Sequence, residues 1–193
     1  MASVSELVLS AETIVYGFAI ARLLHGAQKI FTSPKSSFTV KLIWVTCCVH
    51  VSSAIWSSTN LFVIDKLDFI DFNIRLIFAG ISYFMCDSLA PHNSENIESF
   101  HDHFFEIRIR YWVCNLLMAL NGIAQIEYTA KYNILPEMYN LFYSVVIIPW
   151  ILIIILGLYA KSEKLQLLAA AIHLIYYIFN GIGTMLNSAS ITN

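Results

Sequence analysis

Two apolar stretches of the chain carry polar side chains at helical spacing, and these residues could bind or conduct a small polar molecule. In residues 41–60, such side chains recur at steps of four, three and four, on one helical face: Thr46, His50, Ser53 and Ser57. The last apolar stretch repeats the pattern with His173, Tyr177, Asn180, Thr184 and Asn187. An unpaired polar group in hydrocarbon costs several kcal/mol, so both faces should turn away from lipid. Ordinary hydrogen bonding between helices and a polar pathway both explain them, and histidine, which titrates near neutral pH, favours the pathway.

Charged residues inside apolar segments form a second set of candidates, because charge within a membrane is costly and often functional. Asp71 and Arg75 are four residues apart and can form an ion pair within one helix. Arg22 either reaches lipid phosphates or pairs with a carboxylate from another helix. Asp87 lies near the end of its segment, so placement at headgroup depth is the alternative for Asp71 and Asp87.

Residues 91–107 form the one long connection, PHNSENIESFHDHFFEI. Apolar residues recur there at helical spacing, which predicts a short helix lying along the membrane interface. Its polar side, including Glu98, His101 and His103, is a candidate surface for a protein partner, and a merely solvated helix face is the alternative. Glu98 and His101 have the E-x-x-H spacing of metal sites in helical bundles, but such sites need two copies. We therefore expect no metal.

The composition indicates a membrane protein. The 193 residues are 58% hydrophobic and 12% charged, whereas soluble domains have about 25% charged residues. The net charge of −2 gives no reason to expect a nucleic-acid partner. The four cysteines lie in apolar runs without the spacing of a zinc site or a disulfide framework.

These features predict an all-α fold: one transmembrane helical domain over residues 1–193, with about six spans. The expected spans are 7–28, 40–60, 69–90, 108–128, 139–160 and 165–187. Pro149 should kink the fifth span, which is otherwise aliphatic and expected to face lipid. Lys and Arg are concentrated in the odd-numbered loops, which predicts that these loops are cytoplasmic and that both termini lie outside the inner membrane, in the periplasm or extracellular space.

The run FAIARLLHG at residues 18–26, a tryptophan-rich second span containing His50, and the stretch HDHFFEIRIRYW at residues 101–112 resemble a group of small bacterial polytopic membrane proteins. The resemblance covers about two thirds of the chain and implies a multi-pass protein of the bacterial inner membrane. His25 stands where the group's pattern has a small residue, which argues against a shared site there. Proteins of this kind also occur as membrane components of bacterial defence systems.

Four functions compete on these observations. The first is a non-enzymatic channel- or transporter-like protein for a small solute or ion. The second is a sensor or effector subunit that uses the 91–107 segment to contact a partner on the cytoplasmic side. A haem protein with His50 or His173 as axial ligands and an intramembrane enzyme are weaker alternatives, and we expect neither a cofactor nor catalytic residues. Besides the lipid bilayer, the expected partner is a second copy of the chain in a homo-oligomer.

Overall fold

The computed structural model describes residues 4–59, 69–90, 97–133 and 143–191 of the chain. Within these ranges the side chains of residues 4–5, 57–59, 125–126, 128–133, 143 and 180–191 are not described. The described residues are all helical apart from short connections, and contain no strand. The elements are α1 (Val4–Thr32), α2 (Phe38–Thr59), α3 (Phe69–Leu89), α4 (Phe100–Asn133), a π-helical turn η3 (Tyr143–Ile147), α6 (Ile148–Tyr159) and α7 (Glu163–Ile191).

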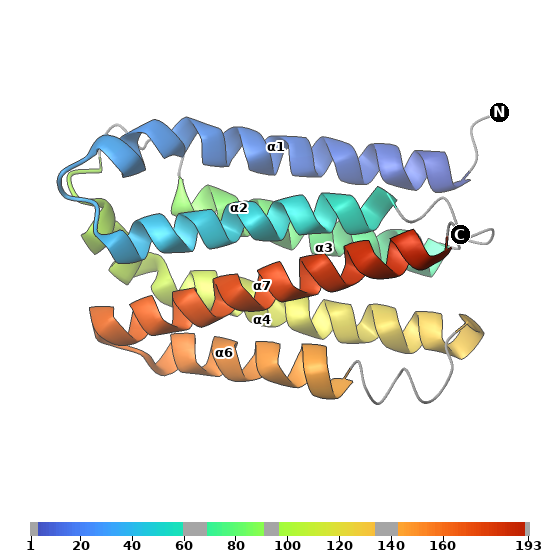
Figure 1. The fold of residues 1–193 in the computed structure, drawn as a ribbon. Helices are drawn as coiled ribbons and strands as arrows, with labels where there is room; N and C mark the ends of the chain where they lie inside the picture. The colour runs from blue at the N-terminus through green and yellow to red at the C-terminus, as the bar shows by residue number, and fades with distance from the viewer. Residues whose placement is uncertain (1–3, 60–68, 91–96, 134–142, 192–193) are drawn as a thin grey trace.

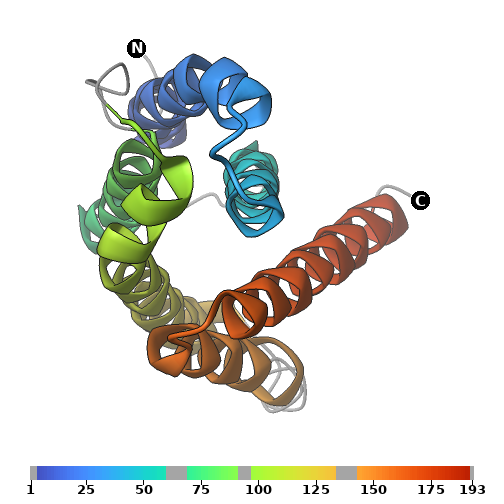
Figure 2. The ribbon, with the colours of Figure 1, turned by 90° about the vertical axis from the view of Figure 1, so that its left-hand side faces the viewer.

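The helices lie side by side and alternate in direction along the chain (Figure 1). Their principal contacts follow one circuit, in which α1 packs on α3, α3 on α4, α4 on α6, α6 on α7, α7 on α2, and α2 on α1. Figure 2 shows this circuit from one end, with α7 crossing the bundle obliquely. The two helices with polar stripes, α2 and α7, are therefore neighbours although they lie far apart in the sequence.

Three of the described helices are long and apolar enough to cross a membrane, namely Glu6–Thr32, Phe38–Trp56 and Phe69–Leu89. A shorter apolar helix covers Ser144–Tyr159. Large apolar side chains cover the outer surfaces of these helices, as Phe18, Phe84 and Leu152 do. An outer surface of this kind is typical of a protein that is solvated by lipid.

The expected helices match the observed ones in order, but residues 100–107 of the predicted interfacial segment do not form a separate helix, and its residues 91–96 lie outside the described part of the chain. Residues 100–107 are the first two turns of α4. Phe104, Ile107 and Tyr111 are all buried, so the apolar face continues into the predicted fourth span without a break. With no proline or glycine between residues 100 and 121, one helix accommodates both segments.

Pro149, where the sequence predicts a kink, closely follows a local irregularity of the helix. The π-helical turn ends directly before α6, and Pro149 occupies the first turn of α6, where its missing N–H costs no hydrogen bond within the helix. The Tyr176 hydroxyl donates a 3.1 Å hydrogen bond to the Val146 carbonyl in that turn. The expectation that this span only faces lipid is too simple, because Trp150 and Ile154 are buried against the bundle.

A buried polar network joins α4, α6 and α7. The Trp112 indole donates a 2.9 Å hydrogen bond to Gln166 Oε1. Gln166 Nε2 in turn donates to the carbonyls of Gly157 and Ala160, each at 2.7 Å. These contacts satisfy the amide of Gln166 and the free carbonyls at the end of α6, so a fully buried glutamine is tolerated there.

Candidate functional site

The polar faces of α2 and α7 meet in a seam, which we call the polar seam. The two helices run in the same direction (Figure 1). Near the start of both helices, the Thr39 hydroxyl donates a 3.3 Å hydrogen bond to Glu163 Oε1. About two helical turns further along both helices, Thr46 Oγ1 lies 3.5 Å from the Ala170 carbonyl. Both contacts join residues 124 positions apart, so the two helices keep one register along the seam.

The centre of the polar seam is a cluster of two imidazoles and one phenol. The ring of Tyr177 lies 4.9 Å from that of His50 and 4.6 Å from that of His173, between ring centroids. His50 is 3% exposed and His173 is 0% exposed, so both turn into the bundle. The expectation that the stripes face inward therefore agrees with the fold for Thr46, His50, His173 and Tyr177, all of which are buried.

The two histidines differ in their hydrogen bonds. His50 Nε2 lies 3.4 Å from the Ser82 hydroxyl of α3, which itself donates to the Phe78 carbonyl. In contrast, neither ring nitrogen of His173 has a hydrogen-bond partner among the described residues. Its ring instead packs near Trp112, with 5.5 Å between centroids. A fully buried imidazole with a free donor and a free acceptor is unusual in a folded protein.

The cluster also tests the haem alternative. The phenol ring of Tyr177 packs against both imidazoles. A haem with both histidines as axial ligands would therefore have to displace Tyr177. No group of three His, Cys, Asp or Glu side chains that could hold a metal ion occurs within the described part of the chain.

Charges within the apolar helices are matched across the contact between α1 and α3. Arg22 Nε lies 3.0 Å from Asp87 Oδ1. The buried Glu12 of α1 interacts electrostatically with Arg75 of α3, more strongly than Asp71 does. The sequence analysis proposed the other four charged residues as candidates but not Glu12. A carboxylate within an apolar run is the sequence feature that could have identified it.

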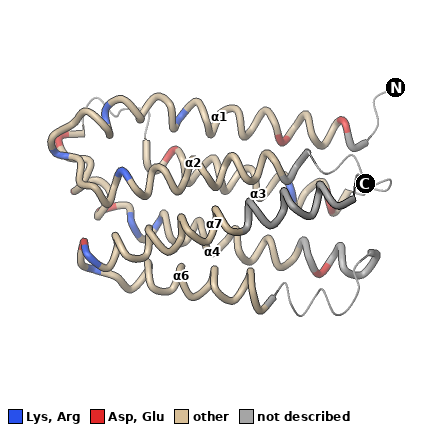
Figure 3. Tube along the Cα trace, viewed as in Figure 1, with Lys and Arg blue, Asp and Glu red and all other residues tan. Residues whose placement is uncertain are grey.

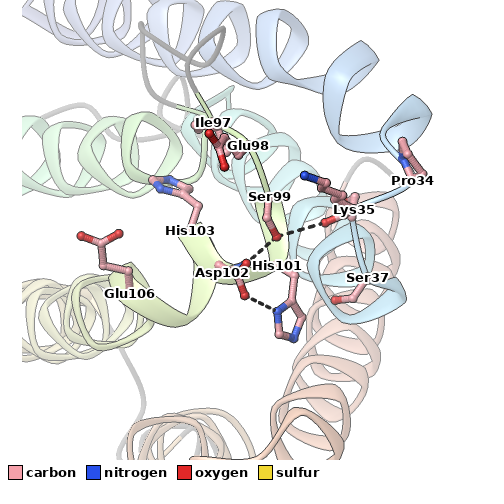
Figure 4. Close-up of a pocket in the computed structure, with 11 residues that line it drawn as sticks. Pro34, Lys35, Ser37, Ile97, Glu98, Ser99, His101, Asp102, His103 and Glu106 are labelled. Carbon is pink, nitrogen blue, oxygen red and sulfur yellow. Dashed lines mark hydrogen bonds and ion pairs between the residues drawn. The ribbon is translucent and has the colours of Figure 1, made fainter.

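An open groove lies at one end of the bundle, between the α1–α2 connection and the start of α4 (Figure 4). Its volume is about 820 Å³. The lining residues are Pro34, Lys35, Ser36, Ser37, Ile97, Glu98, Ser99, His101, Asp102, His103 and Glu106. The three residues that the sequence proposed as a partner surface, Glu98, His101 and His103, all line it.

His101 connects the groove to the polar seam. Its Nδ1 lies 3.0 Å from Asp102 Oδ1, and its Nε2 lies 3.6 Å from Glu163 Oε2. Glu163 is the same residue that accepts a hydrogen bond from Thr39 of the seam. Hydrogen bonds from His101 and then from Ser99 lower the pKa of Asp102 below its ordinary value.

The groove is also held by its backbone. The amide of His101 and the hydroxyl of Ser99 both donate to the Lys35 carbonyl, at 3.4 and 3.5 Å. His103 Nε2 lies 3.1 Å from the Ser88 carbonyl at the end of α3. These contacts tie the start of α4 to the α1–α2 connection and to the end of α3.

The remaining candidates of the two stripes are described only in part. Ser53 is partly buried on α2. The side chains of Ser57, Asn180 and Thr184 lie outside what the structure describes. The sequence did not single out Thr39, Glu163 or Gln166, because each becomes notable only when α2, α4, α6 and α7 are brought together.

Comparison of the chain with family models, curated proteins and solved structures found no match. The resemblance to small bacterial membrane proteins therefore remains an expectation from the sequence.

Proposed function

We propose that this chain is a non-enzymatic multi-pass protein of the bacterial inner membrane that conducts a small solute or ion along the polar seam. The observation that carries the proposal is the inward placement of His50 and His173 from two helices, where the ring nitrogens of His173 have no hydrogen-bond partner among the described residues. In a bundle that needs only helix–helix bonding, such polar atoms would be paired. A homo-oligomer in the lipid bilayer is the form in which we expect it to act.

The proposed topology follows the distribution of basic residues. Lys and Arg gather at the end of the bundle that holds the groove (Figure 3), and we call this the charged end. By the positive-inside rule the charged end is cytoplasmic, which puts both termini on the outer face. The six-span count is part of this proposal, since it needs α4, α6 and α7 to cross as well.

The experiment is a flux measurement on purified protein reconstituted into liposomes. His50→Ala and Asn180→Ala should change the flux of small ions or neutral solutes while the protein keeps its helical circular dichroism and its elution volume in detergent. His25→Ala is the matched control, because His25 is exposed on α1. Flux that is equal in wild type, both variants and the control would contradict the proposal.

A second function is supported by the groove, which has the mixed charge expected of a surface for a cytoplasmic protein partner. The chain would then be a sensor or effector subunit, as in bacterial signalling or defence. Glu98→Lys with His103→Glu should abolish co-purification of one defined partner from native membranes without loss of the protein. A wild-type protein that purifies from those membranes without any partner would contradict this alternative.

A further inference from the structure

The centre of the polar seam contains more hydrogen-bonding capacity than the surrounding protein uses. His173 is fully buried, and neither of its ring nitrogens has a hydrogen-bond partner in the part of the chain that the structure describes. Tyr177 of α7 lies against both imidazoles. Because a neutral imidazole carries one donor and one acceptor, His173 can receive a hydrogen bond on one side and give one on the other. This arrangement is what a proton relay requires.

The register of the seam places this cluster near the middle of the membrane. Thr39 faces Glu163 and Thr46 contacts Ala170, so His50 lies at almost the same depth as His173. Eleven residues separate Thr39 from His50, which is about 16 Å at 1.5 Å per residue. The hydrocarbon core of a bilayer is about 30 Å thick, so the two imidazoles lie about halfway across.

The surroundings of the cluster favour a proton over a larger ion. Aromatic rings pack directly on the imidazoles, with Phe78 5.8 Å from His50 and Trp112 5.5 Å from His173 between centroids. A hydrated metal ion does not fit between rings at these separations. Among the described residues, the titratable side chains packed on the two histidines include Tyr177 and Tyr176 of α7, with Tyr176 6.3 Å from His173 between ring centroids. Tyr111 of α4 and Cys47 of α2 interact electrostatically with Tyr177. Each of these groups carries an exchangeable proton, and none of them is a carboxylate.

The charged end supplies access from water. His101 lines the groove and contacts Glu163, and Glu163 accepts the hydrogen bond from Thr39 at the start of the seam. Imidazole, carboxylate and hydroxyl thus follow one another from the groove into the seam. Thr46, which is fully buried, is the next hydroxyl towards His50.

Resting on the proposed function, we infer that the conducted ion is the proton, which passes from the groove at His101 and Glu163 along the polar seam to a relay formed by His50, Tyr177 and His173. At each imidazole a new N–H bond forms on one ring nitrogen while the N–H bond on the other breaks. The ring therefore ends neutral, and charge moves without oxidation or reduction of any group. The inferred relay requires water between those side chains that lie beyond hydrogen-bond distance of one another.

The test measures currents of the wild-type protein in planar bilayers, with a pH gradient and a KCl gradient imposed separately. The reversal potential should follow the pH gradient and ignore the KCl gradient. His173→Gln and His50→Gln keep a hydrogen-bonding side chain of similar size but cannot titrate, and each should reduce proton current to the level of protein-free bilayers. His25→Gln should conduct as the wild type does.

The outcomes separate this inference from the function it rests on. A wild-type current whose reversal potential follows K⁺ or Cl⁻ would overturn the proton relay and leave a conducting protein. Proton current that persists in both glutamine variants would also overturn it. The absence of any ion or neutral-solute flux in the wild type would overturn the relay and the proposed function together. Because the reversal potential is measured on the wild type, a variant that fails to fold does not prevent the test.

Discussion

Arg22 and Asp87 hold α1 against α3 through a contact that is only partly shielded from solvent, at 26% and 38% exposure of the side chains. The sequence identified both residues as costly charges and left open whether Arg22 meets lipid or another helix. It could not pair them, because Arg22 and Asp87 are 65 positions apart in the sequence. Their pairing depends on the register between two different helices. Local spacing contains no information on that register.

A double-mutant cycle with Arg22→Gln and Asp87→Asn should therefore give a coupling free energy of roughly 0.5–1 kcal/mol, the upper part of the range for partly exposed ion pairs. The measurement is unfolding in mixed micelles, followed by circular dichroism. Lys161→Gln, at an exposed position of the charged end, is the control and should not couple to Asp87→Asn. A coupling free energy of zero for Arg22 and Asp87 would show that the pair does not form in the folded protein.

Asp102 gives a pH dependence with a definite sign. Its pKa in the folded protein is lowered, chiefly by the hydrogen bond from His101. A lowered folded pKa adds stability above the unfolded value, about 3.9, and that stability is lost as the pH falls through the folded pKa. Wild type should thus melt at a higher temperature than Asp102→Asn at pH 6, and the difference should shrink as the pH falls below the unfolded pKa of about 3.9. A difference in melting temperature that grows as the pH falls would contradict the assigned contact.

At the scale of helices, the amphipathic pattern predicted which faces turn inward, and the interior of α2 and α7 agrees with it. The pattern did not predict that α4 runs unbroken through residues 100–133, because a polar turn with three charged or imidazole side chains resembles an interfacial segment. The buried apolar face that continues through Phe104, Ile107 and Tyr111 explains why these residues belong to one helix. Packing partners such as Trp112 and Gln166 could not be found, since they meet only in the assembled bundle.

Gly157 allows α6 to approach α4 closely. A Cβ atom at this position would collide with the indole ring of Trp112, which is fully buried and held by Gln166. Gly157→Ala should therefore lower the free energy of unfolding by roughly 1–3 kcal/mol, the usual cost of overpacking. The measurement is the same unfolding titration in mixed micelles.

Gly17 offers the matched control, because nothing lies within 4 Å of a Cβ atom built there. Gly17→Ala should leave stability unchanged or raise it by up to about 1 kcal/mol, since alanine favours helix more than glycine does. Equal effects of the two substitutions would show that α6 and α4 do not pack through Gly157.

At the scale of the whole molecule, one end of the bundle carries the groove, the basic residues and the start of the polar seam (Figure 3). The sequence predicted the clustering of basic loops, and the alternating helix directions bring these loops together. If the charged end is cytoplasmic, Lys35→Cys should react with a membrane-impermeant maleimide in inverted vesicles and not in intact spheroplasts. Labelling in spheroplasts alone would reverse the topology.

The account depends most on the polar seam, so the decisive measurement is disulfide cross-linking in native membranes. In a chain whose four cysteines are replaced by alanine, Thr46→Cys and Ala170→Cys should be joined by a mild oxidant, because Thr46 contacts the Ala170 backbone. Ser52→Cys with Ile172→Cys, both exposed on the same two helices, is the control pair and should stay reduced. Cross-linking of the first pair alone is the predicted result; cross-linking of the control pair alone would contradict the inward-facing seam.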